Sequence, residues 1–264
     1  MNLCKRILAI SFKEKSVFRF DYILETLFSF LYIVLKVSLW RGLYGIGRGT
    51  VGGIVLNEMI TYCIFSSFTE GVTKTTVMKD LNRNVLDGSI SSDLLLPVGL
   101  KKYMFLESVT KNIFWTVYGI VPSVLMAVLL FDFRLEIRIL NLAVYALSLI
   151  MGILINFLYN FLFGSSVIWF RNSFFLDNIN SVLQKLFSGA MVPLWFFPAG
   201  LKTVSDYLPF RYIVFEPTAI LLNTGGAGKM ISVLGMQVLW IVLLFCAVTL
   251  VWHRGRNKIM IQGG

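Results

Sequence analysis

Residues 139–163 read ILNLAVYALSLIMGILINFLYNFLF, a run of 25 residues that contains no charged side chain. As a helix this run is about 38 Å long, since each residue adds about 1.5 Å. The hydrocarbon core of a bilayer is about 30 Å thick, so an apolar helix of this length crosses it. The run therefore predicts a membrane-spanning helix, and the rest of the chain is interpreted outward from it.

The composition of the whole chain agrees with a membrane location. The 264 residues are 57% apolar and 15% aromatic, and only 14% are charged. A soluble domain carries roughly 25% charged residues, so this chain lacks the charge to cover a water-facing surface. The mean hydropathy of +0.77 has the same meaning. We expect most of the apolar surface to face lipid.

Five further apolar stretches flank residues 139–163. Together they predict an all-α integral membrane fold with six transmembrane helices in a single domain, residues 1–264. Pro122 lies inside the third stretch and predicts a kink, which neighbouring helices tolerate. The six spans are expected at about residues 22–44, 54–70, 104–131, 139–163, 179–195 and 230–252.

An amphipathic segment precedes the first expected span. Leu3, Ile7 and Ile10 recur at helical spacing, with basic residues between and after them. This pattern predicts an interfacial helix over residues 1–20 whose basic face meets anionic headgroups. The alternative is an ordinary basic tail, because the periodic stretch is short.

Two connections between the expected spans are long. Residues 71–103 form the longest polar stretch of the chain. Residues 196–229 are interrupted by Pro209, Pro217 and a glycine-rich stretch, although they keep many apolar side chains. We expect short interfacial or re-entrant helices there rather than a free loop.

The positive charges predict the orientation in the membrane. The net charge is +10, and Lys and Arg gather in short clusters between apolar runs. Such clusters are typical of cytoplasmic loops and not of a nucleic-acid-binding surface. Residues 1–20 and 71–103 carry five basic residues each, and more follow the last span. This excess predicts that both termini lie in the cytoplasm.

The nucleotide-binding motifs that the chain approaches lack their requirements. Residues 47–52 match GxGxxG but join two expected spans, without the βαβ unit that this motif needs. Residues 225–230 resemble a P-loop only faintly, because Met230 stands where Ser or Thr ligates Mg²⁺. His253 is the only histidine, and the three cysteines form no CxxC pair. We therefore expect no catalytic site, metal site or cofactor in this chain.

Polar side chains inside the expected spans are informative, because an unpaired charge there is costly. Lys36 lies in the outer half of the first span and Glu58 in the outer half of the second, and we expect them to pair. Asn156 and Asn160 share one face of the fourth span. We interpret both as hydrogen-bonding groups between helices, with contact to a transported substrate as the alternative.

Three further stretches carry a family resemblance. They are residues 88–97 (GSISSDLLLP), 187–198 (FSGAMVPLWFFP) and 208–217 (LPFRYIVFEP). With the order of the expected spans, they make the chain resemble the permease subunits of ABC transporters of the type-2 exporter kind. The resemblance is closest to a bacterial branch of export permeases.

The resemblance implies two functional regions. In such permeases the loop after the second span carries a coupling helix that docks on the ATPase, which corresponds here to residues 80–102. Residues 193–217 correspond to an outer gate, although their aromatic side chains also suit interfacial anchors. The candidate coupling residues are Asp80, Arg83, Asp87, Gly88, Asp93 and Pro97. The candidate gate residues are Pro193, Trp195, Phe196, Phe197 and Pro198.

The resemblance also implies a multi-subunit transporter in the bacterial cytoplasmic (inner) membrane. Its active unit has two permeases, identical or different, and two ABC ATPase subunits that bind ATP and Mg²⁺. The expected function is therefore that of a permease subunit of an ATP-driven exporter, in contact with membrane lipid and not with nucleic acid. An ion-coupled secondary transporter is the alternative, but no acidic residue stands out near the membrane centre. A lipid-modifying enzyme needs a catalytic cluster that the sequence does not supply.

Overall fold

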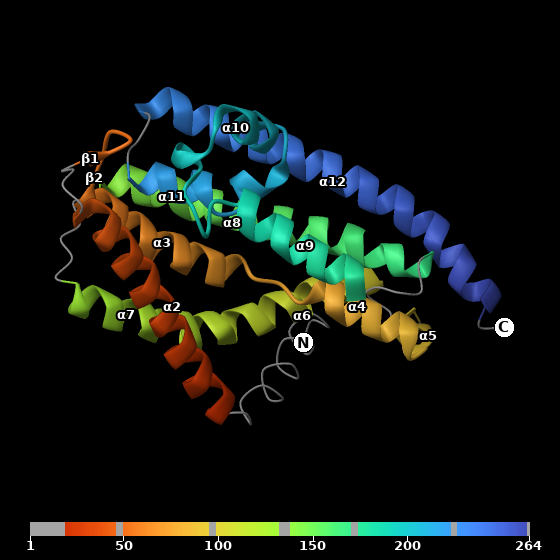
Figure 1. The fold of residues 1–264 in the computed structure, drawn as a ribbon. Coiled ribbons are helices and arrows are strands. Elements are labelled where there is room, and N and C mark those ends of the chain that lie inside the picture. Colours follow the sequence, from red (N-terminus) through yellow and green to blue (C-terminus); the bar gives the residue numbers. More distant parts are fainter. Residues whose placement is uncertain are drawn as a thin grey trace.

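The computed structural model shows a bundle made almost entirely of helices (Figure 1). Helices α8 (Ile139–Ser165) and α12 (Gly226–Gln262) pack against each other along much of their length and form one side of the bundle. The expected interfacial helix at residues 1–20 falls almost wholly outside the described residues. The structure describes residues 19–45, 50–94, 99–131, 138–169, 174–222 and 226–262.

The first half of the chain forms a helical hairpin followed by the long polar connection. Helices α2 and α3 pack against each other, and a short antiparallel pair of strands pairs Thr50 with Val55 between them. After α3, two short helices replace the expected polar loop and lead into the next long helix. The bounds are α2 Arg19–Gly45, β1 Thr50–Val51, β2 Ile54–Val55, α3 Leu56–Thr73, α4 Val77–Leu86, α5 Ile90–Leu94 and α6 Leu100–Trp115.

Among the described residues, four helices are long and apolar enough to cross a membrane. They are Ile23–Gly45, Leu100–Leu130, Ile139–Ile168 and Gly226–Gly255, which correspond to the first, third, fourth and sixth expected spans. An all-α membrane protein is thus supported. The second and fifth expected spans correspond to α3, with 18 residues, and α9 (Phe174–Phe187), with 14. These helices are about 27 and 21 Å long, shorter than the hydrocarbon core.

A π-helical turn precedes Pro122, where the sequence predicted a kink. The turn η1 (Thr116–Ile120) joins α6 to α7 (Val121–Leu130), and Pro122 is the second residue after it. Since Pro122 has no N–H, the carbonyl of Tyr118 lacks its usual helical donor. The Thr26 hydroxyl of α2 donates to that carbonyl at 2.7 Å instead. The Tyr118 carbonyl therefore receives a hydrogen bond from a side chain of the neighbouring helix, as the lipid environment requires.

Residues 196–222, the described part of the expected outer segment, fold into short helices, as the prolines predicted, and α11 packs against α8 and α3. Helix α11 (Phe215–Leu221) is buried along its whole length. Gln237 of α12 is fully buried, and its amide donates to the carbonyls of Ser148 at 3.0 Å and Tyr212 at 2.9 Å. These bonds fix the segment to α8 and α12. The remaining bounds are η2 Ser166–Ile168, η3 Leu194–Phe196, α10 Ala199–Asp206 and η4 Pro209–Tyr212.

Candidate functional site: the joint between α4 and the membrane helices

Helix α4 presents one apolar face to the bundle and one polar face to solvent. Val77, Met78 and Leu81 are buried, with Leu81 fully so. A Cβ added to Gly164 of α8 would lie 3.1 Å from the Met78 Cα, so this glycine lets α4 approach α8 closely. The opposite face exposes Lys79, Arg83 and Leu86, which recur at helical spacing. We call this face, with the exposed turn residues Asp87, Gly88, Ser91 and Ser92, the α4–α5 surface.

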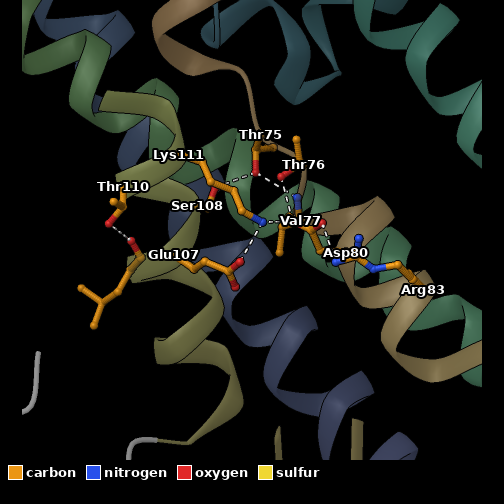
Figure 2. A network of polar contacts seen from close by, with 10 residues as sticks. Thr75, Thr76, Val77, Asp80, Arg83, Glu107, Ser108, Thr110 and Lys111 are labelled. Atoms are coloured by element: carbon orange, nitrogen blue, oxygen red, sulfur yellow. Dashed lines mark hydrogen bonds and ion pairs between the residues drawn. The ribbon is translucent and has the colours of Figure 1, made fainter. Parts of the chain in front are cut away.

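A charged network joins α4 to α6 (Figure 2). The Lys111 ammonium of α6 lies 2.7 Å from Asp80 Oδ2 of α4 and 2.7 Å from Glu107 Oε1 of its own helix. Asp80 also accepts a hydrogen bond from Thr76 at 2.8 Å, and Arg83 lies 3.6 Å from its other oxygen. These side chains are only about one-fifth exposed, apart from Arg83. Lys111 therefore ties two helices together through two carboxylates.

The short loop between α3 and α4 is also held against α6. The hydroxyls of Thr75 and Ser108 lie 2.9 Å apart, and Thr75 also accepts the backbone N–H of Val77 (Figure 2). Asn112 donates to the carbonyl of Val72, the second contact between this loop region and α6. Because the loop is fixed at several points, α3, α4 and the C-terminal half of α6 form one connected unit.

A ladder of three buried asparagines ties α3, α8 and α9 together. Asn156 of α8 donates to the Thr73 carbonyl at the end of α3 at 2.7 Å. Asn160 donates to the Asn156 side chain at 2.7 Å, and Asn180 of α9 donates to the Asn160 side chain at 3.1 Å. Asn180 also reaches the sulfur of Met78 in α4, at 3.1 Å. The two predicted intramembrane asparagines therefore do bond between helices, and α4 rests on the end of this ladder.

The α4–α5 turn is built from the other candidate coupling residues. Asp87 is exposed, and its carboxylate accepts the backbone N–H of Ser89 at 3.0 Å. The hydrogen bonds from Ser89 lower the pKa of Asp87 below its usual value. Gly88 has φ +80°, a left-handed conformation that suits glycine. Asp93 belongs to α5, whereas Pro97 lies outside the described residues.

The candidate gate residues lie near the C-terminal end of α2 and the N-terminal half of α3. Pro193 is buried, and the Trp195 ring packs edge-on against Tyr62 and Phe215, with centroids 5.0 Å away in each case. The Phe196 ring lies 4.9 Å from that of Trp40. Further along, Phe197 packs against Phe187, and Pro198 is exposed before α10. The structure thus gives three of the five gate residues aromatic contacts, namely Trp195, Phe196 and Phe197.

A buried ion pair in the outer segment was not predicted from the sequence. Glu216 is 3% exposed and accepts two hydrogen bonds from Arg211, at 3.1 and 2.6 Å. Arg211 also contacts the carboxylate of Asp206. The available signal is an arginine and a glutamate five residues apart, enclosed between Pro209 and Pro217.

The expected pair between Lys36 and Glu58 is wrong. The Lys36 ammonium instead donates to the Ser66 hydroxyl at 2.7 Å, and no ion pair of the described residues joins Lys36 to Glu58. Ser66 lies eight residues beyond Glu58, about 12 Å further along α3. Glu58 stays at the start of α3, where its carboxylate faces the N–H of Val55 at 3.4 Å.

Residues 29–263 match the family model described as ABC-2 family transporter protein. The chain belongs to the ABC-2 transporter family. Searches of curated proteins and of solved structures return no match. The match covers every candidate site described above, and it makes the chain a multi-pass permease of an ABC transporter. In the ABC-2 family such permeases are membrane components that associate with ABC ATPase subunits.

Proposed function

We propose that this ABC-2 permease is the membrane-spanning subunit of an ATP-driven exporter in the bacterial cytoplasmic membrane. In this proposal α3 and α9 complete a set of six spans, and both termini lie in the cytoplasm. A second permease, identical or different, completes the path, and the partner ATPases bind ATP and Mg²⁺. The family match supports the permease role, whereas the direction of transport is proposed from the resemblance to export permeases.

The observation that carries the proposal is the way α4 is held. The α4–α5 surface is exposed and mixed in charge. The large apolar side chain of Leu86 is 57% exposed there, beside Arg83 and Asp87. An exposed apolar residue within a polar rim is typical of a docking surface. Its inner side is bonded to α6 through Asp80 and Lys111 and rests on α8 and α9 through Met78.

This arrangement gives α4 and α5 a mechanical role. A force applied to the α4–α5 surface by a moving ATPase reaches α6 through an ion pair and α8 through direct packing. In the proposal ATP closure of the ATPases pushes this surface, and the connected helices change the access of the path. The candidate gate residues around Trp195 lie at the far end of α3 and open the path outward.

The test reverses one charge on the proposed docking surface. We expect Arg83→Glu, and more so Arg83→Glu combined with Leu86→Glu, to prevent copurification of the ATPase from native membranes while the permease still inserts and folds. Lys202→Glu makes the same charge change on an exposed residue of α10 and serves as the control. ATP-dependent uptake of the substrate into inside-out vesicles then tests export. Retention of the ATPase by the double variant contradicts the proposed docking surface.

A further inference from the structure

Lys36 places a charged group deep inside a candidate span. In the helix Ile23–Gly45 it lies about 20 Å from one end and about 14 Å from the other. The side chain is 7% exposed. A charge at such a depth is costly unless it is paired or reaches water, and intramembrane ionisable residues therefore mark functional sites by default.

The contacts of Lys36 do not neutralise it. Its ammonium donates to Ser66 at 2.7 Å, and its nitrogen lies 5.9 Å from the ring centroids of both Tyr32 and Tyr62. These are neutral partners, and the ion pairs found within the described part of the chain do not include Lys36. Ser66 is itself held in place by the Cys63 carbonyl at 3.2 Å. The ammonium thus has a hydroxyl and two aromatic rings around it but no carboxylate in contact.

The surroundings carry more positive than negative charge. Glu70, one turn after Ser66 on α3, interacts electrostatically with Lys36, Lys74 and Lys185 without an ion pair at 4.0 Å or less. Glu25 of α2 interacts electrostatically with Lys74. Lys36 of α2, Lys74 directly after α3 and Lys185 of α9 thus outnumber the carboxylates of Glu70 and Glu25. This arrangement favours an additional anion near the three helices.

We infer that Lys36 binds the anionic group, a phosphate or a carboxylate, of an amphiphilic substrate. The substrate would also have an apolar part, which would lie against the exposed apolar side of α2 next to Tyr32. Tyr32 itself is 41% exposed. That side exposes Phe28 at 68%, Leu31 at 51% and Leu35 at 69%. The assignment of the bound molecule as the transported substrate rests on the proposed function. The binding itself is a property of the permease alone.

The test measures binding to the purified full chain without its ATPase. The midpoint of thermal unfolding in a non-ionic detergent is followed as phosphatidylglycerol is added, since a ligand of the native state raises it. Phosphatidylcholine with the same acyl chains is the zwitterionic comparison, and inorganic phosphate tests the anion without the apolar chain. The variants are Lys36→Met, Lys36→Arg and, as a matched control on an exposed lysine of α10, Lys202→Met.

We expect phosphatidylglycerol to raise the midpoint more than the other two additives do. Lys36→Met should weaken this effect at least about tenfold in concentration, because an anion is left without its buried partner. Lys36→Arg and Lys202→Met should keep it. Equal effects of phosphatidylglycerol and phosphatidylcholine, or an unchanged response of Lys36→Met, would overturn the inference. An effect of inorganic phosphate equal to that of phosphatidylglycerol would overturn the amphiphilic assignment.

If Lys36→Met does not fold, an equal response of the native chain to phosphatidylglycerol and phosphatidylcholine still overturns the inference. The outcome is also independent of ATPase docking. Loss of lipid binding with intact copurification of the ATPase refutes only the Lys36 site, whereas failure of the docking experiment leaves this binding measurement standing.

Discussion

The Lys111 ammonium of α6 lies 2.7 Å from the Asp80 carboxylate of α4, across 31 positions of the chain. The contact links the helix that carries the α4–α5 surface to a helix long enough to cross the membrane. Both side chains are about one-fifth exposed. The pair is therefore sheltered enough to hold its geometry, and it is open enough to be broken without creating a fully buried charge.

Asp80→Asn is expected to weaken coupling more than it weakens folding. Lys111 keeps its contact with Glu107, so the loss of stability should be small, about 1–2 kcal/mol. Transport per ATP hydrolysed by the reconstituted complex should fall severalfold, because α4 then moves with less connection to α6.

The matched control for this prediction is Glu107→Gln, which removes the other carboxylate of Lys111 but keeps the bond between α4 and α6. A double-mutant cycle with Asp80→Asn and Lys111→Met should show an interaction energy for both stability and coupling. Additive effects of the two changes would mean that the contact between Asp80 and Lys111 does not couple α4 to α6.

Asn160→Leu is expected to lower the stability of the bundle. The change deprives the Asn156 side-chain oxygen and the Asn180 amide of a partner in the C-terminal part of α8. Interhelical hydrogen bonds of this kind contribute about 1–2 kcal/mol in model peptides and less in whole membrane proteins. Thermal unfolding in detergent, followed by tryptophan fluorescence, should show a lower midpoint.

Asn82→Leu is the comparison for Asn160→Leu. Asn82 also links α4 to α9, through a 2.9 Å bond to Asp177, but Asp177 keeps access to solvent. Asn82→Leu should therefore lower the stability less than Asn160→Leu does. A larger loss for Asn82→Leu would place the main link between α4 and α9 at that pair.

Gly189→Ala should destabilise the outer segment through two effects. Gly189 has φ +76°, and an added Cβ would lie 2.9 Å from the Cβ of Phe215. The left-handed conformation alone costs a residue with a side chain about 1–2 kcal/mol. The clash adds to this cost, because Phe215 is held by Trp195 and cannot retreat. The yield of folded protein and its unfolding midpoint measure the loss.

Gly88→Ala separates the two effects in the previous prediction. Gly88 has φ +80°, and the space around its added Cβ is open within 4 Å. Only the conformational cost should appear, so Gly88→Ala should be milder than Gly189→Ala. If both variants lose the same stability, packing against Phe215 contributes nothing.

The spans that could be read from the sequence are those in which apolar character is continuous. Residues 139–163 contain no charge, and the structure makes them the core of α8. In α3 the sequence mixes Glu58, Ser66 and Glu70 with apolar residues, because this helix is largely covered by other helices. Hydropathy reports contact with lipid, so it identifies such a shielded helix less clearly.

The contacts of the candidate site were harder to predict than its location. The polar stretch after α3 was visible, but its division into α4 and α5 depends on burial against α8, which hydropathy does not report. Lys36 of α2 pairs with Ser66 rather than Glu58 because of the position along α3 that its side chain contacts. A one-dimensional pattern carries no such register, since it is set by how the two helices pack.

The ion pair between Arg211 and Glu216 should be much more sensitive to single than to double substitution. Glu216 is 3% exposed, so Arg211→Met leaves a buried carboxylate without its main partner. Breaking a buried pair in this way typically costs about 3–5 kcal/mol. Arg211→Met combined with Glu216→Met removes both charges and should be less destabilising than Arg211→Met alone.

Asp206 provides the control for this pair, because it contacts the same arginine but its side chain is 48% exposed. Asp206→Asn should change the unfolding midpoint little, since exposed ion pairs contribute about 1 kcal/mol or less. If the double variant is as unstable as Arg211→Met, the loss does not come from the unpaired charge of Glu216. The two side chains themselves would then be needed for this segment to fold. In that case the contacts of Arg211 with Tyr212 and Phe215, at 5.8 Å from each ring, carry the difference.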